Sequence, residues 1–519
     1  MLNLKEYVVT LHSRESLDDF YTDMETEGGS LHIPIRQVEV SNRRPNSRNT
    51  HYYLSDQEAA QLRNDPRVLA VELLPERLGL KVLPMYEQSS SGWDKSNDND
   101  SEHKNWGLLR VVEGVQRTDW GVDGQASQSG TINITSTGKN VDIVIVDGHF
   151  NPLHPEFAVH EDGTGGSRVK QYNWFRHNPT VTGESVGTYI YTPYVDTRSV
   201  SRTDDNDHGA HVAGIAAGST QGWARAANLY NINPYSTNPN VFNALYIFDY
   251  VRAFHTAKPV NPQTGRPNPT IINNSWGYFY EMPISEIQSV TYRGDIVLSG
   301  RNVNSDSLAK FGIINDGTYT VVPSRYYAID ADLEDAMQDG IIIVGAAGNN
   351  SMKMDVSGGP DYDNYFTYNF TSVYYHEGTS PGSSPGTISV GAVGNFVNET
   401  KADYSNCGPR VDIYAPGSCI MSSVNSTNIG ARDNRNSNYG IQKFSGTSMA
   451  SPQVTGVLAC VLEAYPTLTQ QQAREYILLH AKNDQITDTG GGYTDFSSLQ
   501  GSKNEYLFYS LERQASSTA

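Results

Sequence analysis

The chain has 519 residues, more than one ordinary domain uses, so we expect one large core with additional segments. Its 38 Lys and Arg residues against 57 Asp and Glu residues give a net charge of −19, which argues against a surface for nucleic acid or acidic membranes. No apolar run reaches the length of a membrane helix, so the sequence predicts no membrane partner.

The first 86 residues are predicted to form a small α+β domain. Residues 7–11 and 68–72 are typical of strands, and Ser55 is placed to cap a helix over residues 55–62. A polar linker rich in Ser, Asn and Asp follows over residues 87–105, and such a composition cannot build a core.

Residues 106–488 are predicted to form the main domain, where the first chemically informative residue is Asp147. It follows a β-branched apolar run at 141–146, which is typical of a buried parallel strand. Functional groups in open α/β sheets gather at the carboxyl ends of strands. Next along the chain, His208 opens a helix of small residues, and its titration near neutrality suits it to act as a general base.

Ser448 lies among small residues shortly before Pro452, which favours the first turn of a helix. The backbone N–H groups and the dipole at a helix start can stabilise an oxyanion. Asp147, His208 and Ser448 therefore form a candidate triad. In it, Ser448 attacks a carbonyl carbon, His208 accepts the proton, and Asp147 holds the imidazole in the required tautomer.

These motifs resemble those of the subtilisin-like serine peptidases, and their spacings are most similar to the proteinase K branch. The resemblance covers six segments in family order: 141–157, 207–214, 271–277, 340–350, 404–417 and 444–456. It implies a three-layer α/β fold with a mostly parallel central sheet flanked by helices. The implied function is a serine endopeptidase that cleaves peptide or protein substrates through an acyl-enzyme and requires no cofactor.

The resemblance also implies roles for further residues. Asn349 would donate its side-chain amide to the oxyanion, beside the Ser448 backbone N–H. The substrate pocket would be lined by two short segments, Ser275, Trp276 and Gly277 on one side and Ala346, Ala347 and Gly348 on the other.

The N-terminal domain resembles the inhibitor-like propeptide of the family. This implies a self-inhibited precursor whose own N-terminal domain occupies the cleft, with a cut between Leu80 and Lys104. Met85 or Tyr86 would precede the cleaved bond. The alternative is a permanent structural or docking domain.

Two insertions, near residues 278–328 and 351–385, and a C-terminal tail at 489–519 complete the main domain. The first insertion contains a segment typical of extra strands, at 290–297. The second contains Asp355, Asp361 and Asp363, but their spacing matches no known calcium loop. A solvated acidic loop is therefore expected, with no metal ligands assigned and a calcium site elsewhere left open.

The residues after Asp147 depart from the family pattern, in which a Ser or Thr and then a Gly follow the aspartate. Here Gly148 and His149 stand in these places. The lost hydroxyl removes a hydrogen bond to a charged group, worth about 1.5–3 kcal/mol. His149 either replaces that bond or is an idle surface residue. The rival function is a catalytically weak or inactive structural protein that keeps this fold within a larger assembly.

The N-terminus shows no basic segment followed by an apolar core, so no secretory signal is predicted. The three cysteines, Cys407, Cys419 and Cys460, are too few for a disulfide framework. They are expected to be reduced packing residues, with a disulfide between Cys407 and Cys419 as the alternative. Together these features predict a cytoplasmic protein or part of a larger particle, with secretion by another route left open.

Overall fold

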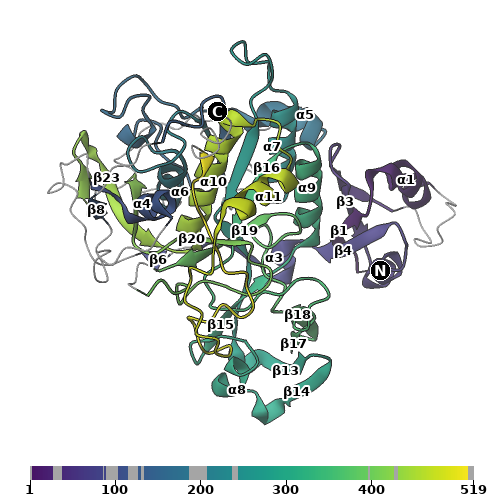
Figure 1. Ribbon diagram of the computed structural model, residues 1–519. Coiled ribbons are helices and arrows are strands. Elements are labelled where there is room, and N and C mark those ends of the chain that lie inside the picture. The colour runs from purple at the N-terminus through teal and green to yellow at the C-terminus, as the bar shows by residue number, and fades with distance from the viewer. Residues whose placement is uncertain are drawn as a thin grey trace.

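The computed structural model describes residues 3–26, 38–85, 87–88, 103–114, 127–129, 134–185, 207–235, 244–394, 398–425 and 431–511. A large α/β domain carries a small domain against one side and a set of insertion strands at one end (Figure 1).

The large domain is built around an eight-stranded sheet. Its order is β10 (Asn228–Ile232), β9 (Asp142–Val146), β11 (Thr270–Asn274), β16 (Ile342–Ala346), β19 (Ile388–Val393), β20 (Ile413–Pro416), β25 (Glu505–Tyr506) and β24 (Lys482–Asn483). All neighbours pair parallel except β24 and β25. The inner strands are buried on both faces, which is why β9 and β16 are nearly continuous hydrophobic runs.

Helices cover both faces of this sheet, and the predicted three-layer fold is confirmed. One face packs against α4 (Trp106–Glu113), α6 (His208–Ala217), α10 (Thr447–Ala464) and α11 (Gln470–His480). The other face packs against α7 (Ile247–Thr256) and α9 (Tyr327–Gln338). Alternation along β9 divides the two cores, because Ile143 and Ile145 point to the first face and Val144 and Val146 to the second.

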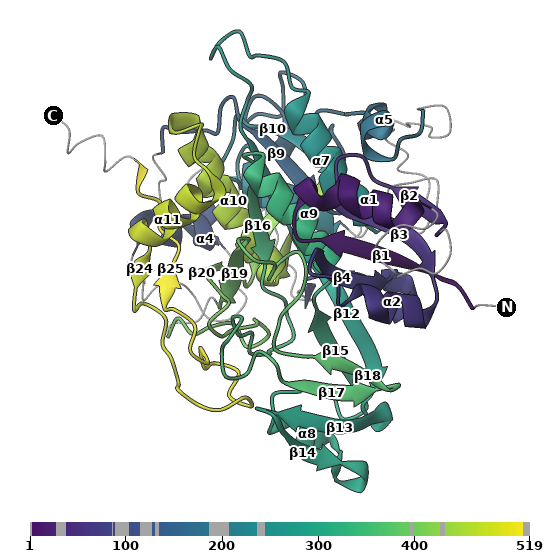
Figure 2. The same ribbon diagram turned by 90° about the vertical axis from the view of Figure 1, so that its right-hand side faces the viewer.

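The small domain is an antiparallel sheet with two helices on its outer face (Figure 2). The strand order is β2 (Val40–Arg43), β3 (Asn49–Leu54), β1 (Lys5–Leu11) and β4 (Val68–Leu73), and the helices are α1 (Leu17–Glu25) and α2 (Asp56–Leu62). The predicted strands and the helix capped by Ser55 are confirmed, since Ser55 and Glu58 form a reciprocal capping box. The inner face of the sheet lies against α7 and α9, where Val8 joins the core of the large domain.

The first insertion extends the main domain with strands, as its sequence predicts. β12 (Trp276–Pro283) pairs with β15 (Tyr319–Ser324), and α8 (Ser305–Ala309) lies between them in the chain. A second sheet joins both insertions through β14 (Asp295–Ser299), β13 (Ile287–Tyr292), β17 (Tyr365–Tyr368) and β18 (Thr371–Tyr374).

The remaining elements are short or lie at the edges. They are α3 (Pro75–Leu78), β5 (Lys81–Pro84), β6 (Glu87–Gln88), β7 (His103–Asn105), β8 (Ser127–Ser129), α5 (Asn178–Val181), β21 (Ile420–Val424), β22 (Ala431–Asp433) and β23 (Asn436–Ser445). As predicted, Cys407, Cys419 and Cys460 form no disulfide in the described part of the chain, and all three thiols are buried. Over the described ranges, no helix is long and apolar enough to cross a membrane.

Candidate active site

The predicted catalytic residues meet at the carboxyl edge of the central sheet. Asp147, Ser275 and Asn349 follow the neighbouring strands β9, β11 and β16, so parallel pairing brings the three strand ends together. His208 is the first residue of α6, and Ser448 is the second residue of α10. The two helices pack against each other over this edge.

Asp147 and His208 are fully buried and hydrogen-bonded to each other. The Nδ1 of His208 lies 2.7 Å from Oδ1 of Asp147. This contact places the imidazole proton on Nδ1 and leaves the lone pair on Nε2. The Gly148 backbone N–H donates to the same Asp147 oxygen over 2.7 Å, whereas Oδ2 has no hydrogen-bond partner among the described residues.

His149 does not replace the hydrogen bond that a Ser or Thr would give to the Asp147 carboxylate, but it is not an unengaged surface residue either. Its Nδ1 lies 3.0 Å from Oδ1 of Asn231 on β10. The Asn231 amide donates in turn to the carbonyl oxygens of Ile145, Asp147 and Gly148 over 3.1–3.3 Å. His149 and Asn231 therefore hold the backbone on either side of the acid. Asn231 was not predicted from the sequence, although a polar side chain within the β10 strand was an available signal.

Ser448 presents two donors to its surroundings, and neither bonds to His208. Its hydroxyl donates to the Ser275 carbonyl oxygen over 3.0 Å, and its backbone N–H donates to the Met85 carbonyl oxygen over 3.0 Å. The Ser275 hydroxyl returns a hydrogen bond to the Ser448 carbonyl oxygen over 3.1 Å. A rotation of the Ser448 side chain is thus needed before His208 can accept its proton.

Asn349 is anchored to Thr447, the first residue of α10. Its Oδ1 accepts hydrogen bonds from the Thr447 backbone N–H at 2.9 Å and from the Thr447 hydroxyl at 2.8 Å. Its buried Nδ2 has no partner among the described residues. A fixed amide donor beside the Ser448 backbone N–H is the arrangement that stabilises a carbonyl oxygen as it gains negative charge.

The segment before residue 86 lies in the cleft as an added strand. β5 pairs antiparallel with β12, with Pro84 opposite Trp276, Leu83 opposite Gly277 and Lys81 opposite Phe279. β6 then pairs with β23, just before Ser448. The segment therefore crosses the candidate nucleophile in the extended form that peptide-binding edges select.

The Met85 side chain fills an apolar pocket and is 2% exposed. It packs with Phe279, Ala346 and Val321. A Cβ on Gly277 would lie 2.6 Å from the Met85 Cε and 2.4 Å from the Thr379 hydroxyl, so this position has room for glycine alone. The structure thus places Gly277 and Ala346 of the predicted pocket at the Met85 side chain, while Trp276 points into the core beneath.

The expected solvated acidic loop is wrong for Asp355 and Asp361, which are buried beside basic residues, whereas Asp363 is exposed. Asp361 lies 2.6 Å from the Lys353 ammonium and 2.7 Å from the Arg293 guanidinium, and these contacts hold the pKa of Asp361 well below its usual value despite partial burial. Lys353 also lies 3.9 Å from Asp355. Within the described ranges, no three His, Cys, Asp or Glu residues are grouped as metal ligands.

Comparison with known proteins gives relatives that are peptidases. The chain is 25% identical over 437 residues to an extracellular serine proteinase of Thermus sp. strain Rt41A, covering 84% of this chain and 71% of that protein. It is 24% identical over 440 residues to alkaline serine exoprotease A of Vibrio alginolyticus, covering 84% of this chain and 56% of that protein. It spans 43% of subtilisin-like protease 2 of Pseudogymnoascus destructans. Fervidolysin from Fervidobacterium pennivorans is a similar solved structure, with 18% identity, a TM-score of 0.49, and 97% and 60% coverage of this chain and that one.

The expected cytoplasmic location is wrong in the light of these relatives, because the Thermus protein is extracellular. That expectation rested on the N-terminal residues and on the cysteine count. The cysteine count does not identify the compartment, because buried thiols pack as small apolar groups in any compartment.

The Subtilase family, Peptidase_S8, matches residues 138–501, which contain every predicted catalytic residue. The matched range begins just before β9 and includes the central sheet up to the loop before β25. The chain therefore belongs to the subtilase family of serine peptidases.

Proposed function

We propose that the chain hydrolyses peptide bonds through Ser448, His208 and Asp147. Ser448 Oγ attacks the scissile carbonyl carbon while His208 Nε2 accepts the hydroxyl proton, and Asp147 stabilises the imidazolium that forms. The Asn349 amide and the Ser448 backbone N–H stabilise the oxyanion. His208 then gives the proton to the leaving amine, and water hydrolyses the acyl-enzyme by the same steps.

One observation carries this proposal: the Ser448 backbone N–H donates to the Met85 carbonyl oxygen over 3.0 Å. A peptide carbonyl of the chain itself therefore accepts a hydrogen bond from the backbone N–H that would stabilise the oxyanion. The Met85 backbone N–H also donates to the Ser275 carbonyl oxygen over 3.1 Å. This hydrogen bond fixes the peptide on the N-terminal side of the bond after Met85, where β5 lies.

We infer that the first 85 residues are an inhibitor-like propeptide and that the bond after Met85 is the one the enzyme cuts in itself. The apolar pocket around Met85 and the strand pairing of β5 support this inference. The join between α6 and β10 is short, which supports membership of the proteinase K branch. Subtilisin itself carries an extra calcium-binding loop, and this join has no room for one.

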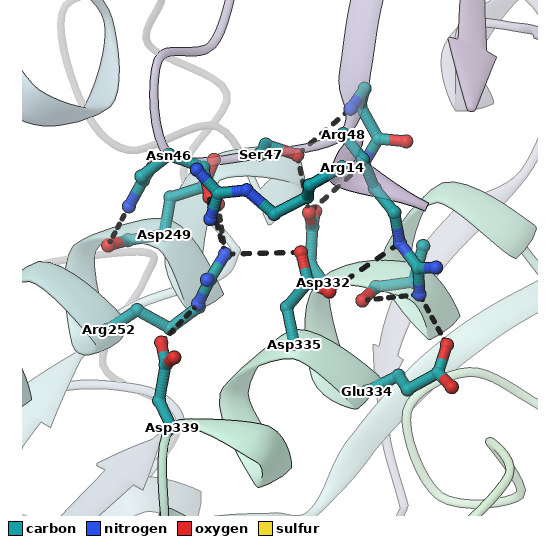
Figure 3. A network of polar contacts seen from close by, with 12 residues as sticks. Arg14, Asn46, Ser47, Arg48, Asp249, Arg252, Asp332, Glu334, Asp335 and Asp339 are labelled. Carbon is teal, nitrogen blue, oxygen red and sulfur yellow. Dashed lines mark hydrogen bonds and ion pairs between the residues drawn. The ribbon is translucent and has the colours of Figure 1, made fainter. Parts of the chain in front are cut away.

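A buried charge network holds the N-terminal domain on the large domain (Figure 3). The Arg44 guanidinium from the loop between β2 and β3 donates to Asp249 on α7 over 2.7 Å and to Asp332 on α9, and all three side chains are 0% exposed. Ser47 donates to the second Asp332 oxygen over 2.7 Å. Arg48 adds an ion pair to Glu334. Arg44 and Arg48 come from the small domain and the acids from the large one, which also contributes Arg252 on α7, 2.7 Å from Asp339 (Figure 3).

Docking of the N-terminal domain is expected to weaken as pH rises through neutrality. Burial raises the pKa of Asp249 to about 7 in the docked state, and the neighbouring Asp332 acts in the same direction, while Arg44 and Arg252 oppose the rise. The docked state holds the proton of Asp249 more tightly than the separated state does, so this contribution to docking is fully present below the usual carboxyl pKa of 3.8. It is lost as the pH rises from there through about 7, where Asp249 ionises in the docked state as well. Burial also raises the pKa of Glu72 to about 8, which acts in the same direction; this residue lies on β4, and its carboxylate accepts from the first backbone N–H groups of α9.

The rate at which peptidase activity appears in purified full-length protein measures this pH dependence. We expect activation to accelerate as pH rises from about 6 to about 8, and Asp249→Asn to reduce the dependence because the residue no longer titrates. Activation that slows over the same range in the wild type would contradict the assignment.

Asn349→Ala is expected to lower kcat by about 10²–10³-fold, because it removes one of the two oxyanion donors. KM should change little, since the donor acts mainly as charge develops. The control is Asn350→Ala, which alters the neighbouring amide whose Nδ2 donates to the Val321 carbonyl oxygen instead. An equal loss in both variants would indicate a structural effect on the loop after β16.

The proposal is tested by the intact mass of wild-type and Ser448→Ala protein after purification. We expect the wild type to lose residues 1–85 and begin at Tyr86, while Ser448→Ala remains full length. Identical cleavage in both proteins would assign the cut to another peptidase and contradict self-processing.

A further inference from the structure

Glu281 lies on β12, in the part of the strand that belongs to the first insertion. We propose that Glu281 is a specificity-determining residue that selects a lysine or arginine at the fifth residue before the cleaved bond. This inference deepens the proposed peptidase function and rests on it.

The strand register fixes which substrate residue meets Glu281. With Met85 before the cleaved bond, Lys81 is the fifth residue back, and it pairs opposite Phe279. Glu281 is two residues further along β12 and shares a face with Phe279, so it is the diagonal neighbour of Lys81. Long side chains reach across such a diagonal. Any substrate that adds to β12 in this register brings its own fifth residue to the same position.

The contact between the two side chains is present in the structure. The Lys81 ammonium donates to Oε2 of Glu281, and the side chains are 54% and 42% exposed. In the part of the chain that the structure describes, Lys81 is the one cation paired with Glu281. Because Lys81 belongs to the segment that departs on cleavage, Glu281 then becomes available to a substrate.

The surroundings of Glu281 favour a large cation. Glu281 lines an open cavity of about 440 Å³ together with Asp316, Tyr319 and Asn350. Two backbone N–H groups hold one Asp316 oxygen and keep the pKa of this carboxyl below its usual value, so a second negative charge faces the same space. A guanidinium therefore fits as well as an ammonium.

The test uses three quenched fluorogenic peptides, Xaa-Val-Leu-Pro-Met-Tyr-Glu-Gln, which copy residues 81–88 with Lys, Ala or Glu in the first place. Each is assayed with protein that is purified as the full chain and then left to lose residues 1–85, and ratios of kcat/KM are compared so that the active fraction cancels. We expect Lys to exceed Ala by up to about 5-fold, as for an exposed ion pair, and Glu to be the slowest. The differences should shrink at about 1 M salt.

Two substitutions of Glu281 separate this reading from general electrostatics. Glu281→Gln should make the three peptides nearly equal, and Glu281→Lys should reverse their order. The matched control, Asp316→Asn, lines the same cavity without touching Lys81 and should keep the wild-type order. An unchanged order in Glu281→Lys overturns the inference alone. A wild-type protein that cleaves none of the three peptides contradicts the proposed function as well.

Discussion

Ser448→Ala is expected to lower the hydrolysis of a peptide substrate by about 10⁶-fold, the size of loss found when the nucleophile of such a triad is removed. The variant also keeps residues 1–85 against its own site, so the measured loss should be at least this large. The comparison requires kcat measured with wild-type and variant protein on one peptide with methionine before the cleaved bond.

The control for this loss is Ser451→Ala, one turn further along α10. Ser451 is buried and its hydroxyl donates to the Asn273 side chain, so its removal tests packing of the same helix without removing the nucleophile. A variant lacking Ser448 that retains a rate close to that of the wild type would exclude the proposed mechanism.

Arg44→Met is expected to weaken docking of the N-terminal domain by about 10²–10⁴-fold. The substitution leaves Asp249 and Asp332 buried without their shared cation, and breaking one side of a buried ion pair costs about 3–5 kcal/mol. Activity should therefore appear much sooner after purification than in the wild type, measured by hydrolysis of a small peptide over time.

Arg43→Met is the matched control, because Arg43 pairs with Glu25 inside the small domain and is 40% exposed. It removes the same charge one residue away and should leave the activation time close to that of the wild type. Adding Asp332→Asn to Arg44→Met should recover part of the lost affinity, since one fewer carboxylate is then buried unpaired. Equal activation times for Arg43→Met and Arg44→Met would rule out this network as the main hold on the domain.

The sequence predicted the fold and the identity of the site residues better than their contacts. Apolar runs mark β9 and β16 locally, and the motif order placed Asp147, His208, Asn349 and Ser448 at positions that the fold brings to one edge. Parallel strands end at the same side of a sheet, so this convergence follows from topology.

Contacts that depend on how strands pair, or on residues far apart in the chain, could not be predicted from the sequence. The predicted cut spanned residues 80–104, and the placement of Met85 against Ser448 required the pairing of β5 with β12. Arg44 and Asp249 are separated by 205 residues, and an arginine in a turn carries no sign of its distant partner. His149 was left between two roles because its partner, Asn231, lies 82 residues away on a neighbouring strand.

Covalent labelling of Ser448 tests the central claim, that this residue is an activated nucleophile, most directly. A serine-directed phosphonylating probe is added to the wild type and to Ser448→Ala, and the adduct is located by mass spectrometry of peptides. We predict an adduct on Ser448 in the wild type, formed faster once residues 1–85 have left the cleft, and no adduct in the variant. A fully processed wild type in which Ser448 stays unlabelled would contradict the account.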